Sequence, residues 1–123
     1  MATLTEGKHP GGLLIWEVLR DYTRETVILA SGAGKLAPGT VLGKITTGGK
    51  YTTLSLGASN GSQNAAGILW GHTDATDADA PGVVLVRGPA IVNRHEIVWP
   101  EAATEAQIAT ATSALAALGI MLR

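Results

Sequence analysis

The sequence predicts a mainly β fold with one C-terminal α-helix (α+β), a small β-sandwich or barrel-like domain carrying an extended N-terminal arm. Three observations lead to this prediction. Short aliphatic and β-branched runs recur between residues 24 and 99, separated by turns that contain Gly or Pro. The last quarter of the chain repeats apolar residues at helical spacing. Residues 1–23 begin with glycine, proline and polar residues that do not favour a regular element.

Residues 1–23 are interpreted as the arm, and residues 24–123 as the domain. The arm's apolar part has the pattern of a helical turn or, equally, of a short strand, and a terminal strand packed on the domain is the alternative to an arm. We expect the arm to add little to the fold, because chain termini are often loose. The arm residues expected to bind a partner are Leu13, Leu14, Ile15, Trp16, Val18 and Leu19.

Strands are then expected in order along the domain. A β-branched run covers 26–30, and Pro38-Gly39 has the composition of a type II turn, in which glycine takes a positive φ. Residues 41–46 and 51–56 flank a glycine-containing hairpin turn. Further strands are predicted at 68–70, 83–87, 90–92 and 97–99, with a polar loop at 57–67 and an acidic segment at 72–82.

One helix is predicted, at about residues 101–118. Pro100 suits a first helical turn, and Thr104 with Gln107 three residues later forms a capping-box pattern. Gly119 is a natural helix stop, after which residues 120–122 are predicted to form a last strand. The apolar stripe of the predicted helix consists of Ile108, Ala111, Leu115 and Leu118.

Composition excludes several classes of function. The chain of 123 residues has a net charge of −1 and only nine Lys and Arg, without a basic run, which argues against nucleic-acid binding. It lacks cysteine, which removes disulfides, thiolate metal sites and a cysteine nucleophile. Its apolar runs are too short to span a membrane, and they lack the features of a secretory signal.

The motifs that suggest chemistry are incomplete. Gly32-Ala33-Gly34-Lys35 lacks both the first glycine and the final hydroxyl residue of a phosphate loop. The serines lack the glycine-flanked pattern of a hydrolase nucleophile. The acidic segment contains the potential ligands His72, Asp74, Asp77 and Asp79, but their spacing does not match a calcium loop. We therefore expect no enzyme activity, no metal and no cofactor.

Two tryptophans stand at the ends of apolar strands. Trp70 closes the run 68–70, and Trp99 is followed directly by Pro100. Tryptophan is common at the centre of protein interfaces and also in cores. Trp70, Trp99 and Pro100 are therefore candidates either as interface anchors or as core residues.

Four stretches of the domain together resemble the phage head decoration protein family, the relatives of the lambda capsid-stabilising protein D. They are residues 24–32, 36–43, 66–69 with 81–87, and 98–103. The last, Val-Trp-Pro-Glu-Ala-Ala, is the most specific, and the arm resembles the family less well.

The resemblance implies a structural protein of the virion that is made in the host cytoplasm. Such a protein binds the outside of the expanded head as a homotrimer, at threefold and quasi-threefold positions, and clamps the major capsid protein against the pressure of packaged DNA. The arm is implied to become ordered on the capsid by pairing with strands of the shell. The partners are thus the major capsid protein and further copies of the chain, with neither nucleic acid nor membrane. The alternatives are a small-molecule-binding β-barrel, a hydrolase-like enzyme and another virion component of the tail or baseplate.

Overall fold

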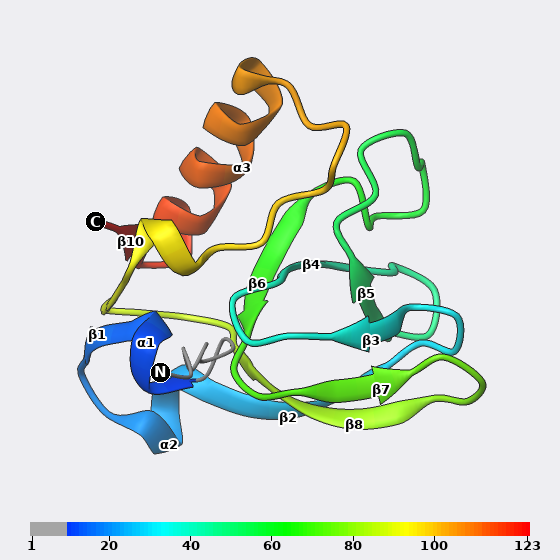
Figure 1. Ribbon diagram of the computed structural model, residues 1–123, viewed down its shortest axis with the longest axis horizontal. Coiled ribbons are helices and arrows are strands. Elements are labelled where there is room, and N and C mark those ends of the chain that lie inside the picture. Colours follow the sequence, from blue (N-terminus) through cyan, green and yellow to red (C-terminus); the bar gives the residue numbers. More distant parts are fainter. Residues whose placement is uncertain (1–9) are drawn as a thin grey trace, which may run out of the picture.

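A computed structural model gives the structure of residues 10–123, which form three β-sheets and one long α-helix near the C-terminus (Figure 1). The predicted class, mainly β with one C-terminal helix, is confirmed. No helix within these residues is long and apolar enough to cross a membrane.

The body of the molecule is a closed five-stranded barrel. Its strands, in order around the barrel, are β2 (Arg24–Leu29), β5 (Tyr51–Thr53), β4 (Val41–Lys44), β6 (Ala65–Leu69) and β8 (Ala80–Leu85). The predicted hairpin is present as β4 and β5, which are antiparallel and shorter than expected. Gly39 has a φ of +95°, as the Pro-Gly turn requires. The closed arrangement leaves few unpaired strand edges on the body.

A two-stranded sheet lies beside the barrel. It pairs β3 (Gly34–Leu36) antiparallel with β7 (Thr73–Ala75). Residues 72–82 were expected to form an acidic segment between strands, whereas the structure places β7 and the start of β8 in it. Buried Ala75 anchors β7 to the barrel core, which explains why this polar segment is ordered as a strand.

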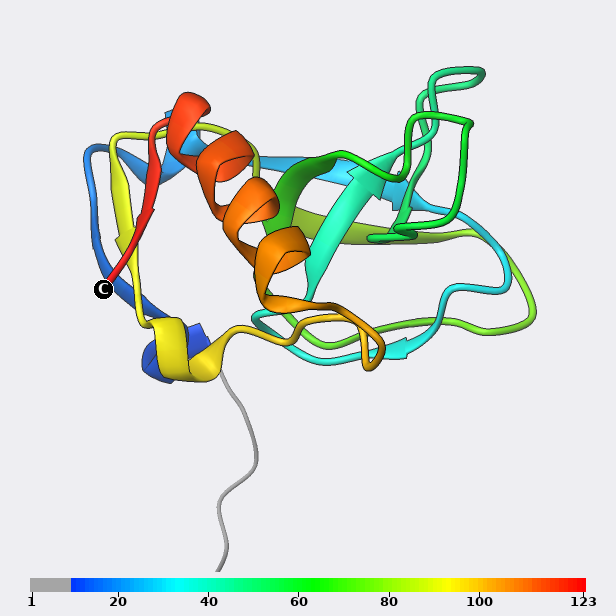
Figure 2. The same cartoon turned by 90° about the horizontal axis from the view of Figure 1, so that it is seen from above.

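The third sheet joins the two ends of the described chain. Its order is β1 (Leu14–Glu17), β9 (Ala90–Val92) and β10 (Ile120–Leu122), with β1 antiparallel and β10 parallel to β9. Figures 1 and 2 show this sheet at one end of the molecule, and Figure 1 shows α2 (Arg20–Thr23) below β1. Strands β9 and β10 appear as predicted, whereas Val98 makes only an isolated bridge with Thr40 in place of the strand expected at 97–99.

The helix α3 covers Glu105–Ala117, whereas the sequence places it at about residues 101–118. Thr104 is extended, with φ −82° and ψ 164°, and caps the helix by accepting a hydrogen bond from the Gln107 amide. The Gln107 side chain in turn accepts from the Thr104 amide, which completes the predicted capping box. The cap therefore fixes the start of the helix after Pro100 rather than at it.

Two apolar cores share one wall of the barrel. One core fills the barrel, and the other lies between the barrel wall, α3 and the three-stranded sheet. Figure 2 shows α3 between this sheet and the barrel. Adjacent residues of the wall strands point into different cores. For example, Ile68 lies in the outer core and Leu69 in the barrel core, and both are fully buried. Burial on both faces explains why this strand is apolar without alternation.

Part of the segment expected to form the arm contacts the rest of the chain, since β1 pairs with β9. Leu13, at the end of α1 (Pro10–Leu13), is fully buried in the outer core. Its carbonyl accepts a hydrogen bond from the Asn93 amide at 2.7 Å, beside η1 (Arg94–Glu96). The apolar character that suggested binding by an arm thus belongs, at Leu13, to the core. Of the expected arm, residues 1–9 lie outside the described residues.

Candidate functional site

Exposed apolar side chains gather at the end of the molecule that carries the three-stranded sheet. Nine large hydrophobic residues among 10–123 are at least 36% exposed, and six of them lie on β1, the turn after it, α2 and β10. We call these six the apolar end surface; they are Ile15, Trp16, Val18, Leu19, Tyr22 and Met121. A concentration of this kind is a common sign of a surface that another protein covers.

A row of apolar residues crosses the sheet at this end. Trp16 on β1 is opposite Ile91 on β9, and Ile91 is opposite Met121 on β10. Directly paired residues share a face of a sheet, so the three side chains lie on one side. Trp16 is 50% and Met121 48% exposed, while Val92 next to Ile91 is fully buried. The row is therefore on the outer face, whereas Val92 and Ile120 beside it lie in the outer core on the inner face.

A compact turn holds the rest of the surface. The carbonyl of Leu19 accepts hydrogen bonds from the amides of Tyr22 and Thr23, both at 2.9 Å. The amide of Val18 donates to the carbonyl of Pro89 at 3.0 Å. These bonds hold the backbone of the turn against the domain, and the side chains of Val18, Leu19 and Tyr22 are exposed to solvent.

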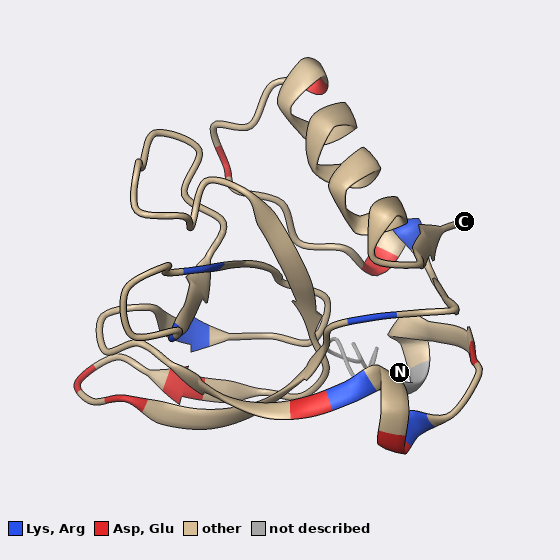
Figure 3. Cartoon of the chain, turned by 180° about the vertical axis from the view of Figure 1, so that it is seen from behind, with Lys and Arg blue, Asp and Glu red and all other residues tan. Residues whose placement is uncertain are grey.

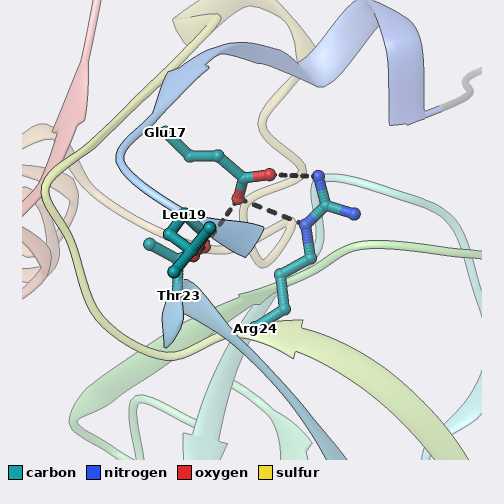
Figure 4. A network of polar contacts seen from close by, with 4 residues as sticks. All are labelled: Glu17, Leu19, Thr23 and Arg24. Atoms are coloured by element: carbon teal, nitrogen blue, oxygen red, sulfur yellow. Dashed lines mark hydrogen bonds and ion pairs between the residues drawn. The ribbon is translucent and has the colours of Figure 1, made fainter. Parts of the chain in front are cut away.

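An ion pair closes the base of this turn (Figure 4). The Arg24 guanidinium donates to both carboxylate oxygens of Glu17, and the Thr23 hydroxyl donates to Glu17 Oε2 at 2.6 Å. The Arg24 and Glu17 side chains are only 17% and 11% exposed. The pair is thus largely shielded from water. A bidentate contact between arginine and a carboxylate is among the strongest side-chain interactions.

The residues predicted to bind a partner through the arm differ in their exposure. Ile15, Trp16, Val18 and Leu19 are exposed together, whereas Leu13 is in the core and Leu14 is partly buried against it. Sequence reasoning did not single out Tyr22, Ile91 or Met121. The last strand, Ile120-Met121-Leu122, is apolar throughout, so the sequence alone indicates neither that Met121 is exposed nor that it pairs with β9.

The predicted anchors Trp70, Trp99 and Pro100 do not join this surface. Trp70 and Trp99 are partly buried and pack against the outer core. The Arg24 guanidinium lies 3.5 Å from the centre of the Trp70 ring, a close cation–π contact. Trp99 and Pro100 line an open hollow beside Leu36 and Leu54.

In the acidic segment, the carboxylates of Asp74 and Asp79 accept hydrogen bonds from other residues of the chain. Asp74 accepts from the side chain and amide of Thr76, and these bonds lower the pKa of Asp74. Asp79 accepts from Lys50 and from the Ser31 amide, which likewise lowers its pKa. Within residues 10–123, no three His, Asp or Glu residues come together in a metal-binding arrangement.

The charges beside the apolar end surface are mixed in sign. Arg20 and Asp21 are adjacent on α2, and Arg24 is followed by Glu25 at the start of β2 (Figure 3). An apolar centre with a polar rim is typical of protein interfaces, whereas phosphate binding needs a surface of positive charge.

Comparison with known proteins adds one match. Residues 3–120 match the protein family described as bacteriophage lambda head decoration protein D, so the match spans nearly the whole chain of 123 residues. No curated protein matches the chain. The matched range includes every residue of the apolar end surface except Met121, which is one position beyond its end.

Proposed function

The chain belongs to the family of the bacteriophage lambda head decoration protein D, and from this premise we propose that it is a cementing protein on the outer surface of the expanded phage head. In this role it binds the major capsid protein and stabilises the shell against the pressure of packaged DNA. Family membership is the observation that carries the proposal. The family is a structural one, which supports a role without catalysis or cofactor.

We propose that the apolar end surface is the part that contacts the shell. Its six members gather at one end, and an exposed apolar group is reasonable to maintain where a partner covers it. The partner is the major capsid protein. Residues 1–9 continue from the same end of the chain, and we propose that they extend the contact onto the shell.

We further propose that three copies assemble around each threefold and quasi-threefold position. A second exposed apolar patch supports contact between copies. Ile28 on β2 and Val83 on β8 are 45% and 36% exposed, on the outer face of the barrel. Three copies that bind together multiply a weak single contact. The number of copies around each threefold position of a decorated head tests this arrangement.

The rival function of a small-molecule-binding barrel lacks support. The interior of the barrel is filled by its own side chains, and none of the residues that fill it is more than 9% exposed. A ligand-binding barrel needs a lined cavity with convergent polar groups. The residues that occupy the interior are Leu29, Leu36, Leu42, Tyr51, Leu69, Ala75, Val84 and Val86.

Co-sedimentation with expanded, empty heads tests the proposed function. The heads are assembled from the major capsid protein of the phage genome that encodes the chain. We expect the wild-type protein to bind saturably, and Leu19→Gln to bind at least about tenfold more weakly, because it puts an amide where apolar surface is buried. Leu118→Gln, on a leucine that is exposed at the end of α3, is the matched control.

Two results would count against the proposal. If the wild-type protein stays in the supernatant at every concentration, the chain does not decorate this head. If Leu19→Gln and Leu118→Gln both bind like the wild type, the contact with the shell lies on another surface.

A further inference from the structure

Two arginines from outside the turn 18–23 make contacts that fix its position, Arg24 at its base and Arg87 at Tyr22. Arg24, the first residue of β2, closes the turn through Glu17 and stacks on Trp70. Arg87, which follows β8, donates hydrogen bonds to the Tyr22 carbonyl and to Glu25, the latter at 2.8 Å. Its guanidinium lies 5.2 Å from the centre of the Tyr22 ring. The turn is thus fixed to the barrel by two cationic side chains.

The two contacts differ in their exposure to water. The Glu17–Arg24 pair is largely buried, whereas the Arg87 and Glu25 side chains are 37% and 50% exposed. Thr23, at the end of the turn, is buried and joins the turn to the barrel. Its carbonyl accepts a hydrogen bond from the Val86 amide at 2.9 Å. Both arginines therefore act on a backbone that is already joined to the body, and they fix the orientation of the residues on its outside.

We propose that Arg24 and Arg87 are positioning residues, which hold the turn 18–23 in the conformation that binds the shell. This inference rests on the proposed function. Val18, Leu19 and Tyr22 are 49%, 58% and 53% exposed on a turn of only six residues, so they meet a partner together only when the turn is ordered. A surface that is ordered before binding avoids the entropic cost of ordering during binding. The arginines themselves do not contact the shell.

The double variant Glu17→Gln/Arg24→Met removes the buried ion pair without leaving one charge alone in a poorly hydrated place. The glutamine keeps an acceptor for the Thr23 hydroxyl, and methionine keeps an unbranched chain on Trp70. Arg87→Met is the second variant, at an exposed position where loss of the fold is not expected. Lys50→Met, which breaks the exposed Lys50–Asp79 pair elsewhere on the barrel, is the matched control.

Two measurements are made on each full-length variant. Hydrogen exchange of the free protein reports the order of residues 18–23, and co-sedimentation reports affinity for expanded heads. We expect exchange in 18–23 to be at least about tenfold faster in both arginine variants, with the strands of the barrel unchanged. We expect affinity to fall about tenfold. The control should change neither quantity.

A combination with Leu19→Gln separates positioning from a general structural effect. If the arginines act through the turn, Glu17→Gln/Arg24→Met weakens binding less in the Leu19→Gln background than in the wild type, because linked residues are not additive. The inference is overturned if the losses of affinity in the combined variant are additive. It is also overturned if hydrogen exchange of residues 18–23 is unchanged in the arginine variants, or if exchange becomes faster while affinity for heads stays the same. If Glu17→Gln/Arg24→Met does not fold, Arg87→Met decides by the same criteria.

Failure of the inference is distinguishable from failure of the proposed function. If the wild-type protein does not bind heads, the proposed function fails, whatever the exchange shows. If the wild type binds and the arginine variants bind equally well, decoration stands and the positioning role is wrong.

Discussion

Two leucines six positions apart have opposite environments in this chain. Leu13 is fully buried in the outer core, whereas Leu19 is 58% exposed on the apolar end surface. Both belong to the same apolar stretch, and their sequence neighbours do not distinguish them. What separates them is that β1 pairs with β9, which brings Leu13 under the sheet and leaves Leu19 in the turn beyond it. One residue thus stabilises the fold, and we propose that the other binds the partner.

The paired substitutions Leu13→Ala and Leu19→Ala test this division of roles. We expect Leu13→Ala to lower the free energy of unfolding by about 2–5 kcal/mol, since it leaves a cavity in a packed core. Leu19→Ala should change it by less than about 0.5 kcal/mol, as is usual for surface positions. Urea denaturation measures both. If both substitutions change the free energy of unfolding by the same small amount, Leu13 is not packed in the core, and the segment that contains it belongs to the arm expected at residues 1–23.

At the scale of elements, α3 and β10 are joined by a tight turn that depends on two glycines. Gly119 has a φ of +90°, and its amide donates to the carbonyl of Ala116, as at a typical helix C-terminus. The Gly88 amide donates a hydrogen bond to the Leu118 carbonyl at 2.7 Å, which brings the backbones of Gly88 and Gly119 close together. A Cβ at 119 would lie 2.9 Å from the Gly88 Cα. This close approach places β10 beside β9 and so Met121 beside Ile91.

Gly119→Ala should therefore destabilise the protein more than the same substitution at a glycine with free space. Gly32 is the matched control, because it also has a φ of +90° but nothing lies within 4 Å of its added Cβ. The left-handed backbone costs roughly 1–2 kcal/mol at both positions. The contact with Gly88 adds to that cost only at 119. Thermal unfolding of the two variants gives the comparison, and equal losses would contradict the packing described for this turn.

Local signals predicted several elements well. The capping box of Thr104 and Gln107, the stop at Gly119 and the hairpin of β4 and β5 depend on residues close in sequence, and all three are present. The resemblance to head decoration proteins, drawn from four stretches, is confirmed by the family match.

Non-local pairing explains what the sequence did not predict. The sheet that carries the candidate site joins residues 14–17, 90–92 and 120–122, and each strand is too short to specify its partner. The row of Trp16, Ile91 and Met121 exists only once that pairing is known. The Glu17–Arg24 pair has the same origin, because it requires the chain to turn back between β1 and β2.

At the scale of the whole molecule, the large apolar residues exposed among residues 10–123 fall mainly into two groups. The apolar end surface lies on the three-stranded sheet and α2, and the patch of Ile28 and Val83 lies on the outer face of the barrel. The proposed trimer on the shell needs two kinds of contact, one with the capsid protein and one between copies. The division of the exposed apolar residues of the described chain into two groups supports this proposed arrangement.

Cryo-electron microscopy of expanded heads incubated with the protein tests the central claim most directly. We predict additional density on the outside of the shell at threefold and quasi-threefold positions, with three copies at each. The three-stranded sheet and α2 should face the capsid protein, and the patch of Ile28 and Val83 should lie between copies. Heads without additional density, or copies bound with α2 and Met121 turned toward solvent, would contradict it.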